Sequence, residues 1–435
     1  MDDSLIYSQY NVLFKTSTDI PLLYNSESNN LLELAQELYS VLELISENDT
    51  IISHLNEKVI KYLVENKILV SKKDQDSHKQ EMHDEYVLKN VDNKALSLTI
   101  LPTCDCNFKC SYCFEEGKMK GSMSDETIDD LITFIKSYKN LKSLSLLWFG
   151  GEPLMACKTI VHILDRIKEE VCIPITRHRM ITNGYFINKH ICDIFKQYKI
   201  SWIQLTLDGL KDTHNRVRVL KTGVADTYNT IINNINLILK ECPEMKIRIR
   251  INVSQDNVHE YWRLKKELND LYKSKSIEIY PGFIFNYNSL GTELISPSLT
   301  REQKKDFFLK GDSILFPIQA TKICSATEKD SFIIGPMGEM YKCLKDINVP
   351  NKIISYLDGR KGNLDLERLY MTTTCFSDEE CMNCFLLPLC SGGCCRERIK
   401  KKYQNGKFNL CTLYKDRSFL EKCLEDYYMN KKKII

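Results

Sequence analysis

The sequence has almost no net charge, and it lacks any long run of apolar residues. Its 435 residues contain 60 Lys and Arg against 58 Asp and Glu. The chain therefore lacks the excess of basic residues that binding to duplex nucleic acid or to an anionic membrane would need, and we expect neither as a partner. No stretch approaches the roughly 18 apolar residues that a transmembrane helix needs. Partners must therefore be recognised at local sites.

A secretion signal is also missing from the opening residues. "MDDSLIYSQYNVLF" is acidic and lacks the basic region, the apolar segment and the small-residue cleavage site of a signal peptide. We therefore expect a cytoplasmic protein. The chain nevertheless has 18 cysteines, and the cytosol keeps thiols reduced. This combination favours metal or iron–sulfur ligation over a disulfide scaffold.

Four of these cysteines fall within ten positions of "CDCNFKCSYCFEE". Cys106, Cys110 and Cys113 form a CxxxCxxC triplet, and Cys104 stands outside it. A [4Fe–4S] cluster that only carries electrons takes four ligands, so three thiolates would leave one iron open. No histidine lies near enough in sequence to complete a structural zinc site. The triplet therefore predicts an open [4Fe–4S] cluster.

The triplet followed by an aromatic residue, here Phe114, resembles the signature of the radical S-adenosylmethionine (radical SAM) superfamily. The resemblance implies that Cys106, Cys110 and Cys113 hold a catalytic cluster. It implies that the open iron chelates the amino and carboxylate groups of SAM. An electron from the cluster would then cleave SAM to a 5′-deoxyadenosyl radical.

A glycine pair lies after a strand-like run in "SLSLLWFGGEPLM". Glycines at the end of a strand let the backbone approach a ligand closely, although a lone Gly-Gly pair is usually only a turn. Gly150, Gly151 and Glu152 resemble the GGEP motif of the family. The resemblance implies that they hold the amino group of SAM.

Two further strand-like runs, "RMITNGYFI" and "WIQLTLDGL", end in NG and DG dipeptides. They resemble the family segments that contact the ribose and carboxylate of SAM, which makes Asn183 and Thr206 candidates. In "HNRVR", Arg218 stands where the family often has an arginine near SAM. Each dipeptide could equally be an ordinary turn.

Strands and helices alternate through the middle of the chain. The stretches 125–140, 158–171, 188–199 and 228–242 have apolar residues at helical spacing, and "KIRIRINVS" and "SIEIYPGFIF" are two further strands. Such alternation indicates βαβ units and a parallel sheet, with ligands at the carboxyl ends of the strands. We therefore expect an α/β protein with the partial (β/α)6 barrel of the family.

A second group of cysteines begins at residue 324. The run Cys381-x2-Cys384-x5-Cys390-x3-Cys394 resembles the SPASM extension of radical SAM enzymes, which binds two auxiliary [4Fe–4S] clusters. Together with the SAM-binding cluster, three clusters are implied. By analogy, the first auxiliary cluster takes Cys324, Cys343 and Cys394, and the second takes Cys381, Cys384, Cys390 and Cys411.

The first auxiliary set has only three identified ligands. Its fourth iron could be open, or Cys375 or Cys395 could complete it. An open iron could bind a substrate thiolate, because a thiol on iron is deprotonated. A pair of zinc sites remains an alternative for this region.

The N-terminal residues suggest a small separate domain. Residues 9–25 suggest a hairpin, 29–45 and 56–70 have helical periodicity, and 71–86 is charged. The unit resembles the winged-helix domains that bind leader peptides, although a structural or dimerising role is the alternative. We therefore expect four segments: 1–72 for leader recognition, 73–94 as a charged linker, 95–310 as the barrel and 311–435 as the SPASM domain.

The resemblances together imply an oxidoreductase-type radical SAM–SPASM peptide maturase. Its partners would be a precursor peptide with a leader and an electron donor such as flavodoxin or ferredoxin. A thioether crosslink is the favoured product. One alternative is an anaerobic sulfatase-maturating enzyme that forms formylglycine. The alternative of another class is a non-catalytic iron–sulfur electron carrier or a zinc scaffold.

Overall fold

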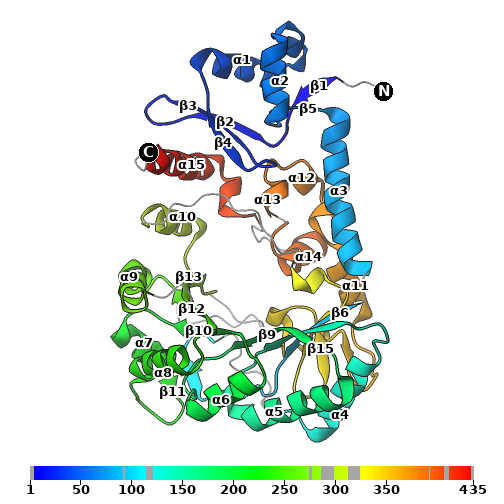
Figure 1. Cartoon of the computed structure of the whole chain (residues 1–435), viewed down its shortest axis with the longest axis vertical. Helices are drawn as coiled ribbons and strands as arrows, with labels where there is room; N and C mark the ends of the chain where they lie inside the picture. The colour runs from blue at the N-terminus through cyan, green and yellow to red at the C-terminus, as the bar shows by residue number, and fades with distance from the viewer. Residues whose placement is uncertain are drawn as a thin grey trace. The chain divides into compact units, whose positions relative to one another are not determined.

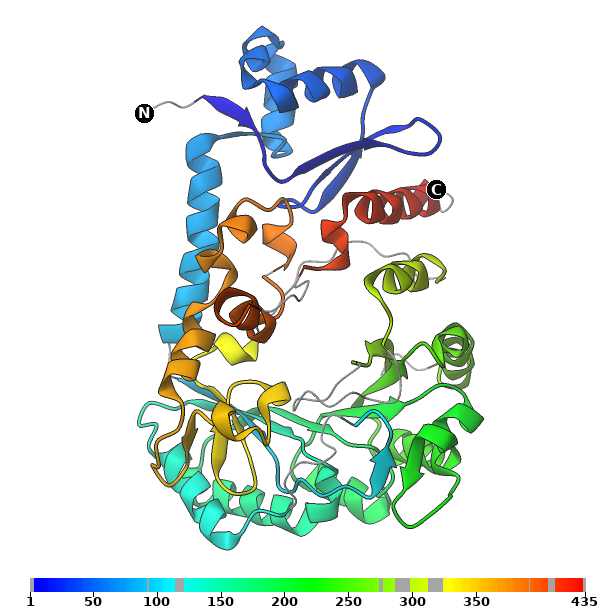
Figure 2. The same cartoon turned by 180° about the vertical axis from the view of Figure 1, so that it is seen from behind.

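The computed structural model describes residues 4–91, 94–113, 121–273, 277–285, 298–311, 324–390, 392–405 and 411–432 (Figures 1 and 2). The chain divides into two compact units. The first contains Met1–Val91, Lys304–Lys329 and Leu369–Ile435, and the second contains Asp92–Gln303 and Asp330–Arg368. Within the described ranges, no helix combines the length and the apolar character that crossing a bilayer would need.

The second unit is built on a sheet with parallel strands at its centre. Neighbouring strands follow the order of the chain, and each described pair is parallel. In order they are β6 (Ala95–Ile100), β8 (Ser143–Trp148), β9 (Ile175–Ile181), β10 (Trp202–Leu207), β12 (Lys246–Val253) and β13 (Ile277–Phe283). The expected α/β fold with a parallel sheet is therefore confirmed.

Three short strands extend the sheet beyond β6. β14 (Ser331–Ile334) pairs with β6 in parallel, whereas β15 (Glu339–Tyr341) and β16 (Ser355–Tyr356) continue it antiparallel. The sheet of the second unit thus contains strands from before and after residues 304–329, which belong to the first unit.

Helices lie along one face of this sheet (Figure 1). They are α4 (Asp125–Lys136), α5 (Cys157–Arg166), α6 (Lys189–Gln197), α7 (Lys211–Val217), α8 (Thr227–Glu241) and α9 (Tyr261–Leu271). The strands alternate accordingly: in β12, Ile247, Ile249 and Ile251 are buried, while Arg248 and Arg250 between them are partly exposed. Burial of each such isoleucine contributes about 1.5–3 kcal/mol to folding.

A buried polar bridge connects β8, β9 and the end of α6. Trp148 Nε1 donates to His178 Nε2 at 2.8 Å, and His178 Nδ1 lies 2.9 Å from the Tyr198 carbonyl. An indole nitrogen can only donate, so Nε2 accepts and Nδ1 carries the proton of a neutral imidazole. Burial lowers the pKa of His178 to about 4, which keeps the ring neutral.

The first unit opens with a three-stranded antiparallel sheet and two helices. The strands are β2 (Asn11–Lys15), β3 (Pro21–Asn25) and β4 (Asn30–Glu33), followed by α1 (Gln36–Glu47) and α2 (Glu57–Glu65). β1 (Leu5–Tyr7) pairs with β5 (Leu69–Ser71). The expected hairpin is β2 and β3. Residues 30–33 were expected to be helical, but they form β4 because pairing with β3 overrides their local periodicity.

The charged segment after residue 71, expected to be a linker, forms the long helix α3 (Lys72–Val91). Its Tyr86 is buried, and its hydroxyl donates to the carbonyls of Thr327 and Met371, both at 3.3 Å. Tyr86 thus anchors a largely polar helix, together with Met82, which packs against the core that contains Tyr10, and Gln75, which accepts from Gln9 N.

Short helices carry the C-terminal cysteines of the first unit. They are α12 (Glu379–Met382), α13 (Leu387–Cys390) and α14 (Cys395–Tyr403), and the longer α15 (Arg417–Lys432) follows. Leu386, Leu420 and Leu424 pack in one core with Val12 and Phe14 of β2. The cysteine-bearing segments therefore share a hydrophobic core with the N-terminal sheet.

Candidate active site

The cysteine triplet lies on a loop that a small two-stranded ribbon holds in place. β7 (Phe108–Cys110) pairs antiparallel with β11 (Arg218–Leu220), and Lys221 N donates to the Asn107 carbonyl at 2.8 Å. Cys106 Sγ lies 3.4 Å from the amide nitrogen of Phe108. Cys106 and Cys110 therefore lie at the two ends of one short, fixed segment.

In this loop Cys110 is buried, and Cys106 and Cys113 are partly buried. Burial raises the pKa of Cys106 to about 11 and that of Cys110 to about 12, and Cys113 acts electrostatically on both. Free thiols here keep their protons at neutral pH, so binding of iron must displace them. Three sulfur donors on one loop are the ligand chemistry that an iron–sulfur cluster uses.

The glycine pair after β8 packs against the cysteine loop. A Cβ atom on Gly150 would lie 2.2 Å from the Thr103 carbonyl oxygen, and one on Gly151 would lie 2.4 Å from that of Asp105. The backbone nitrogen of Glu152 donates to the same Asp105 carbonyl at 2.8 Å. We expected these glycines to admit a ligand; in the structure their close approach is to the backbone just before Cys106.

Glu152 connects the ends of two neighbouring strands. Its buried carboxylate accepts hydrogen bonds from Thr182 Oγ1 at 2.6 Å, Asn183 N at 2.7 Å and Leu154 N at 3.0 Å. Burial raises the pKa of this carboxyl, while the three donors oppose the rise. The side chain thus fixes the turn that presents Asn183.

Asn183 touches the cysteine loop directly. Its Nδ2 donates to Asn107 Oδ1 at 2.8 Å and lies 3.9 Å from Cys106 Sγ. Thr206 lies on β10 in register with Arg250 of β12 and is partly exposed. Phe114 lies outside the described residues.

Tyr112, which the sequence motifs did not single out, is the centre of a buried network. Its hydroxyl donates to Asp208 Oδ2 at 2.7 Å and accepts from Arg218 Nη1 at 2.9 Å and from Asn252 Nδ2 at 2.8 Å. Arg218 also pairs with Asp208 at 3.2 Å. Burial raises the pKa of Asp208, and Arg218 opposes that rise. Arg218, predicted near SAM, therefore connects the cysteine loop to the end of β10, and Tyr112 connects the same loop to β12.

Glu260 positions the loop that carries Asp208. Its carboxylate accepts from Leu210 N and from Thr213 Oγ1, both at 2.7 Å. Gly209 in this loop has φ of +80°, and a Cβ there would lie 2.3 Å from Glu260 Oε2. Nothing local in the sequence indicates this role, because Glu260 is far from Asp208 along the chain.

A cavity of about 390 Å³ lies beside this network. Polar side chains dominate its lining: Ser111, Tyr112, Asp208, Thr213, Arg216, Asn252, Ser254, Asp256 and Asn257. Its volume is within the range of small-molecule sites. Within the described part of the chain, Asn107 Nδ2, Asn252 Oδ1 and Arg218 Nε are buried without a hydrogen-bond partner. Unsatisfied donors and acceptors next to the thiols suit a polar cofactor such as SAM.

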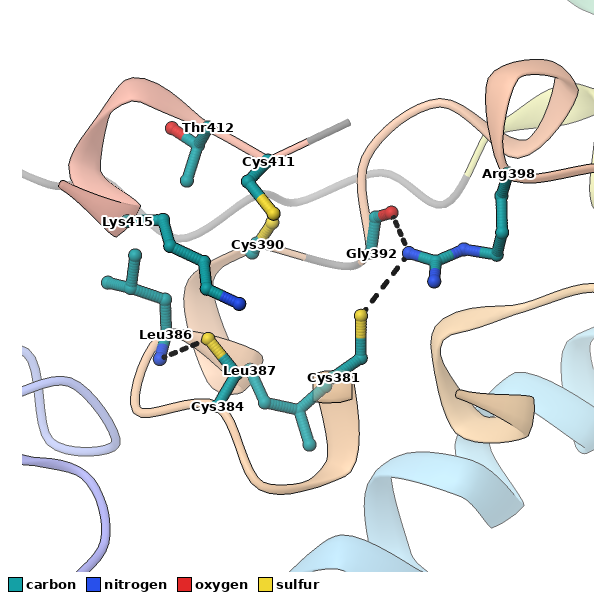
Figure 3. Close-up of a pocket in the computed structure, with 10 residues that line it drawn as sticks. All are labelled: Cys381, Cys384, Leu386, Leu387, Cys390, Gly392, Arg398, Cys411, Thr412 and Lys415. Carbon is teal, nitrogen blue, oxygen red and sulfur yellow. Dashed lines mark hydrogen bonds between the residues drawn. The ribbon is translucent and has the colours of Figure 1, made fainter. Parts of the chain in front are cut away.

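Four cysteines of the C-terminal region line a second cavity, and Figure 3 shows their sulfur atoms directed into a common space. They are Cys381, Cys384, Cys390 and Cys411. Leu386 N donates to Cys384 Sγ at 3.5 Å, and Arg398 Nη2 donates to Cys381 Sγ at 3.3 Å. The sequence predicted these four thiols as one set, and their shared cavity suits the four ligands of a cluster.

The other predicted auxiliary set is divided between the units. Cys343 follows β15 in the second unit, whereas Cys324 and Cys394 belong to the first and act on each other electrostatically. Their grouping stays a prediction. Among the described residues, no three His, Cys, Asp or Glu side chains are arranged to hold a single metal ion.

Three cysteines outside the predicted ligand sets contact the protein backbone or pack in a hydrophobic core. Cys395 Sγ donates to the carbonyls of Tyr370 and Thr373, both at 3.4 Å. Cys375 is buried beside Gly392. A Cβ atom added at Gly392 would lie 2.5 Å from the Cβ atom of Cys375. Cys104 packs in a core that includes Tyr341.

Taken together, these features define an α/β fold with three cysteines near the carboxyl edge of a parallel sheet. Residues 100–264 match the sequence model of the radical SAM superfamily, which identifies this part of the chain as a radical SAM domain. The predicted cofactor types, SAM and [4Fe–4S], are those of this family.

Curated relatives match most of the chain. The radical SAM cyclopropyl synthase TigE of Paramaledivibacter caminithermalis is 22% identical, over 94% of each chain. The cysteine-type anaerobic sulfatase-maturating enzyme of Clostridium novyi is 24% identical, over 76% of this chain and 95% of the relative. The solved structure of anSMEcpe with bound AdoMet and Cp18Cys peptide has a TM-score of 0.58 at 18% identity. The match covers 78% of this chain and 98% of the solved chain, and it supports the fold.

Proposed function

We propose that the protein is a radical SAM peptide maturase that introduces an oxidative modification, with a thioether crosslink favoured, into a ribosomally made precursor peptide. The observation that carries the proposal is the cysteine loop held beside the 390 Å³ cavity. Reactive sulfur ligands and a small-molecule site thereby share one edge of the sheet. Two relatives that match most of the chain, a radical SAM cyclopropyl synthase and a sulfatase-maturating enzyme, support the proposal.

In this proposal, Cys106, Cys110 and Cys113 hold the first cluster, with SAM bound against it. The bound pair supplies one-electron cleavage of SAM and removal of a hydrogen atom from the substrate. Tyr112 and Arg218 fix the end of the loop against β10 and β12. The network thereby holds the loop that carries the three thiols beside the cavity, which Ser111 and Tyr112 of that loop line.

The contacts to SAM are also part of the proposal. We assign its amino group to Gly150, Gly151 and Glu152, and its ribose and carboxylate to Asn183, Thr206 and Arg218, with Phe114 beside the cluster. In the described structure Glu152 and Asn183 already contact the cysteine loop or the turn above it. A ligand there would complete hydrogen bonds that Arg218 Nε and Asn107 Nδ2 lack.

Bound auxiliary clusters would accept the electron that the peptide radical gives up when it is oxidised. We assign one to Cys381, Cys384, Cys390 and Cys411, which line one cavity. We assign the other to Cys324, Cys343 and Cys394. A flavodoxin or ferredoxin would supply electrons to the first cluster.

We assign recognition of the leader peptide to residues 1–72. The segment 73–94 would join this part to the barrel of residues 95–310, and we assign residues 311–435 to the SPASM domain. Among the described strands, β4 has β3 as its sole partner and so presents a free edge. An extended peptide can add a strand to such an edge, with affinity from backbone hydrogen bonds.

Co-expression with a short peptide encoded beside the gene, followed by mass spectrometry, tests the proposal. A crosslink removes the mass of two hydrogen atoms, and Cys106→Ala should abolish the change. Cys192→Ala, which alters a buried cysteine in α6, should retain it. Loss of one sulfur and two hydrogen atoms with gain of one oxygen at a cysteine would instead identify formylglycine formation, the second candidate, which the similarity to a sulfatase-maturating enzyme favours. An unmodified peptide with an iron-replete enzyme would contradict both.

A further inference from the structure

Two cationic side chains line the cavity that the four C-terminal thiols share (Figure 3). Arg398 extends from α14, and Lys415 ends the 3₁₀ turn η9 (Leu413–Lys415). Arg398 Nη2 donates to Cys381 Sγ at 3.3 Å, and Lys415 acts electrostatically on Cys384. No Asp or Glu is among the described residues of the lining. The cavity therefore combines sulfur ligands with positive charge.

Arg398 is held in one position by its other contacts. Its side chain is 6% exposed, and it pairs with Asp378 and donates to the Gly392 carbonyl. Gly392 has φ of +82° and leaves no room for a Cβ beside Cys375. The guanidinium thus joins three segments of the cysteine region, and its N–H bond to sulfur is a fixed feature of the fold.

Cations near a bound cluster shift its reduction potential in one direction. A four-thiolate [4Fe–4S] cluster is anionic, and reduction adds a further negative charge. Cations and N–H donors at the ligand sulfurs stabilise the reduced state more than the oxidised state, which raises the reduction potential. Burial strengthens this interaction because the local dielectric is low.

We propose that Arg398 and Lys415 raise the reduction potential of the cluster held by Cys381, Cys384, Cys390 and Cys411, and so make it an electron acceptor. This inference rests on the proposed function, which places a cluster in the cavity. Both residues act through the sulfur ligands and do not contact substrate, so they are positioning residues. The N–H bond from Arg398 should give it the larger effect.

EPR-monitored redox titration of the reconstituted full chain tests the inference. Cys106, Cys110 and Cys113 are replaced by Ala in every sample, so that the first cluster does not contribute. The signal of interest is the one that disappears with Cys381→Ala. Its midpoint potential is then compared among the parent, Arg398→Gln, Arg398→Lys and Lys415→Gln. Lys401→Gln is the matched control, because it removes a charge from the same helix at a side chain that is 51% exposed and pairs with Glu380.

The inference predicts a more negative potential in Arg398→Gln, a smaller shift in Lys415→Gln, an intermediate value in Arg398→Lys, and no shift in Lys401→Gln. Equal potentials in the parent, Arg398→Gln and Lys415→Gln at full iron content would overturn it. If Arg398→Gln does not take up iron, Lys415→Gln decides the question alone. A parent without a signal that depends on Cys381 would instead contradict the proposed cluster site itself.

Discussion

The Tyr112 hydroxyl donates to Asp208 Oδ2 at 2.7 Å, which connects the cysteine loop to the end of β10. Asp208 in turn belongs to the loop that Glu260 holds at Leu210 and Thr213. The position of the three thiols therefore depends on residues at the carboxyl ends of several strands. This is where a parallel α/β sheet places its functional groups.

Removal of the Tyr112 hydroxyl should weaken SAM binding and slow SAM cleavage. Tyr112→Phe keeps the ring but leaves Asp208, Arg218 and Asn252 without their shared partner, at a cost of about 1–3 kcal/mol. We expect a loss of about tenfold or more in the rate of 5′-deoxyadenosine formation.

Tyr198→Phe is the matched control for that variant. Tyr198 also donates to a carboxylate, that of Asp165, at 2.7 Å, but away from the cysteine loop. It should retain the activity of the parent. Equal losses in the two variants would show that the Tyr112 network has only a general structural role.

Alanine at Gly150 should prevent assembly of the first cluster. The new Cβ would overlap the Thr103 carbonyl oxygen and displace the loop that leads to Cys106. We expect about four fewer irons per chain after reconstitution. Gly223→Ala is the control, because Gly223 has a similar φ of +126° and no atom within 4 Å of the place that a Cβ would take. Both variants carry similar backbone strain, so iron loss in both would contradict the packing explanation.

Acidification should destabilise the second unit through His178. Its pKa is about 4 in the folded chain, against an ordinary value of 6.5, so the unfolded chain binds more protons between these values. Stability from this residue is present above pH 6.5 and is lost as the pH falls toward 4, by about 2 kcal/mol at pH 5. Urea unfolding at pH 7 and pH 5 should show a smaller pH dependence in His178→Gln than in the parent. An unchanged dependence would contradict this assignment.

Neighbouring cysteines should differ in their effect on iron content. The Cys395 thiol donates to two backbone carbonyls, so Cys395→Ala should cost about 1 kcal/mol of stability and retain the iron. Cys394→Ala should lose the iron of one auxiliary cluster. Iron counting and visible absorption distinguish the two. Iron loss in Cys395→Ala would identify it as the missing fourth ligand.

Much of the second unit could be predicted because its elements are long and periodic. The period-two pattern of "KIRIRINVS" corresponds to β12, and helical spacing in 228–242 corresponds to α8. Shorter elements were harder. The leucines of residues 30–33 fit a helix equally well, and only pairing with β3 makes them a strand. The polar composition of 72–91 concealed α3, since the contacts that hold it, such as those of buried Tyr86 and of Met82, come from a few scattered residues.

The site could be predicted where one motif contains the chemistry, as in the cysteine triplet. It could not be predicted where distant residues meet. Tyr112 lies inside the triplet, but nothing in the motif indicates its role, and Asn252 and Glu260 likewise act through contacts that only the fold creates. The role of the glycines before Glu152 in SAM binding stays a prediction, and in the structure they approach backbone.

The central claim is that Cys106, Cys110 and Cys113 hold a cluster that cleaves SAM. The most direct test is anaerobic reconstitution with iron and sulfide, followed by an assay of 5′-deoxyadenosine from SAM under dithionite. The parent should form 5′-deoxyadenosine, and the variant with all three cysteines replaced by Ala should form none while keeping its auxiliary iron. An iron-replete parent that leaves SAM intact would contradict the account.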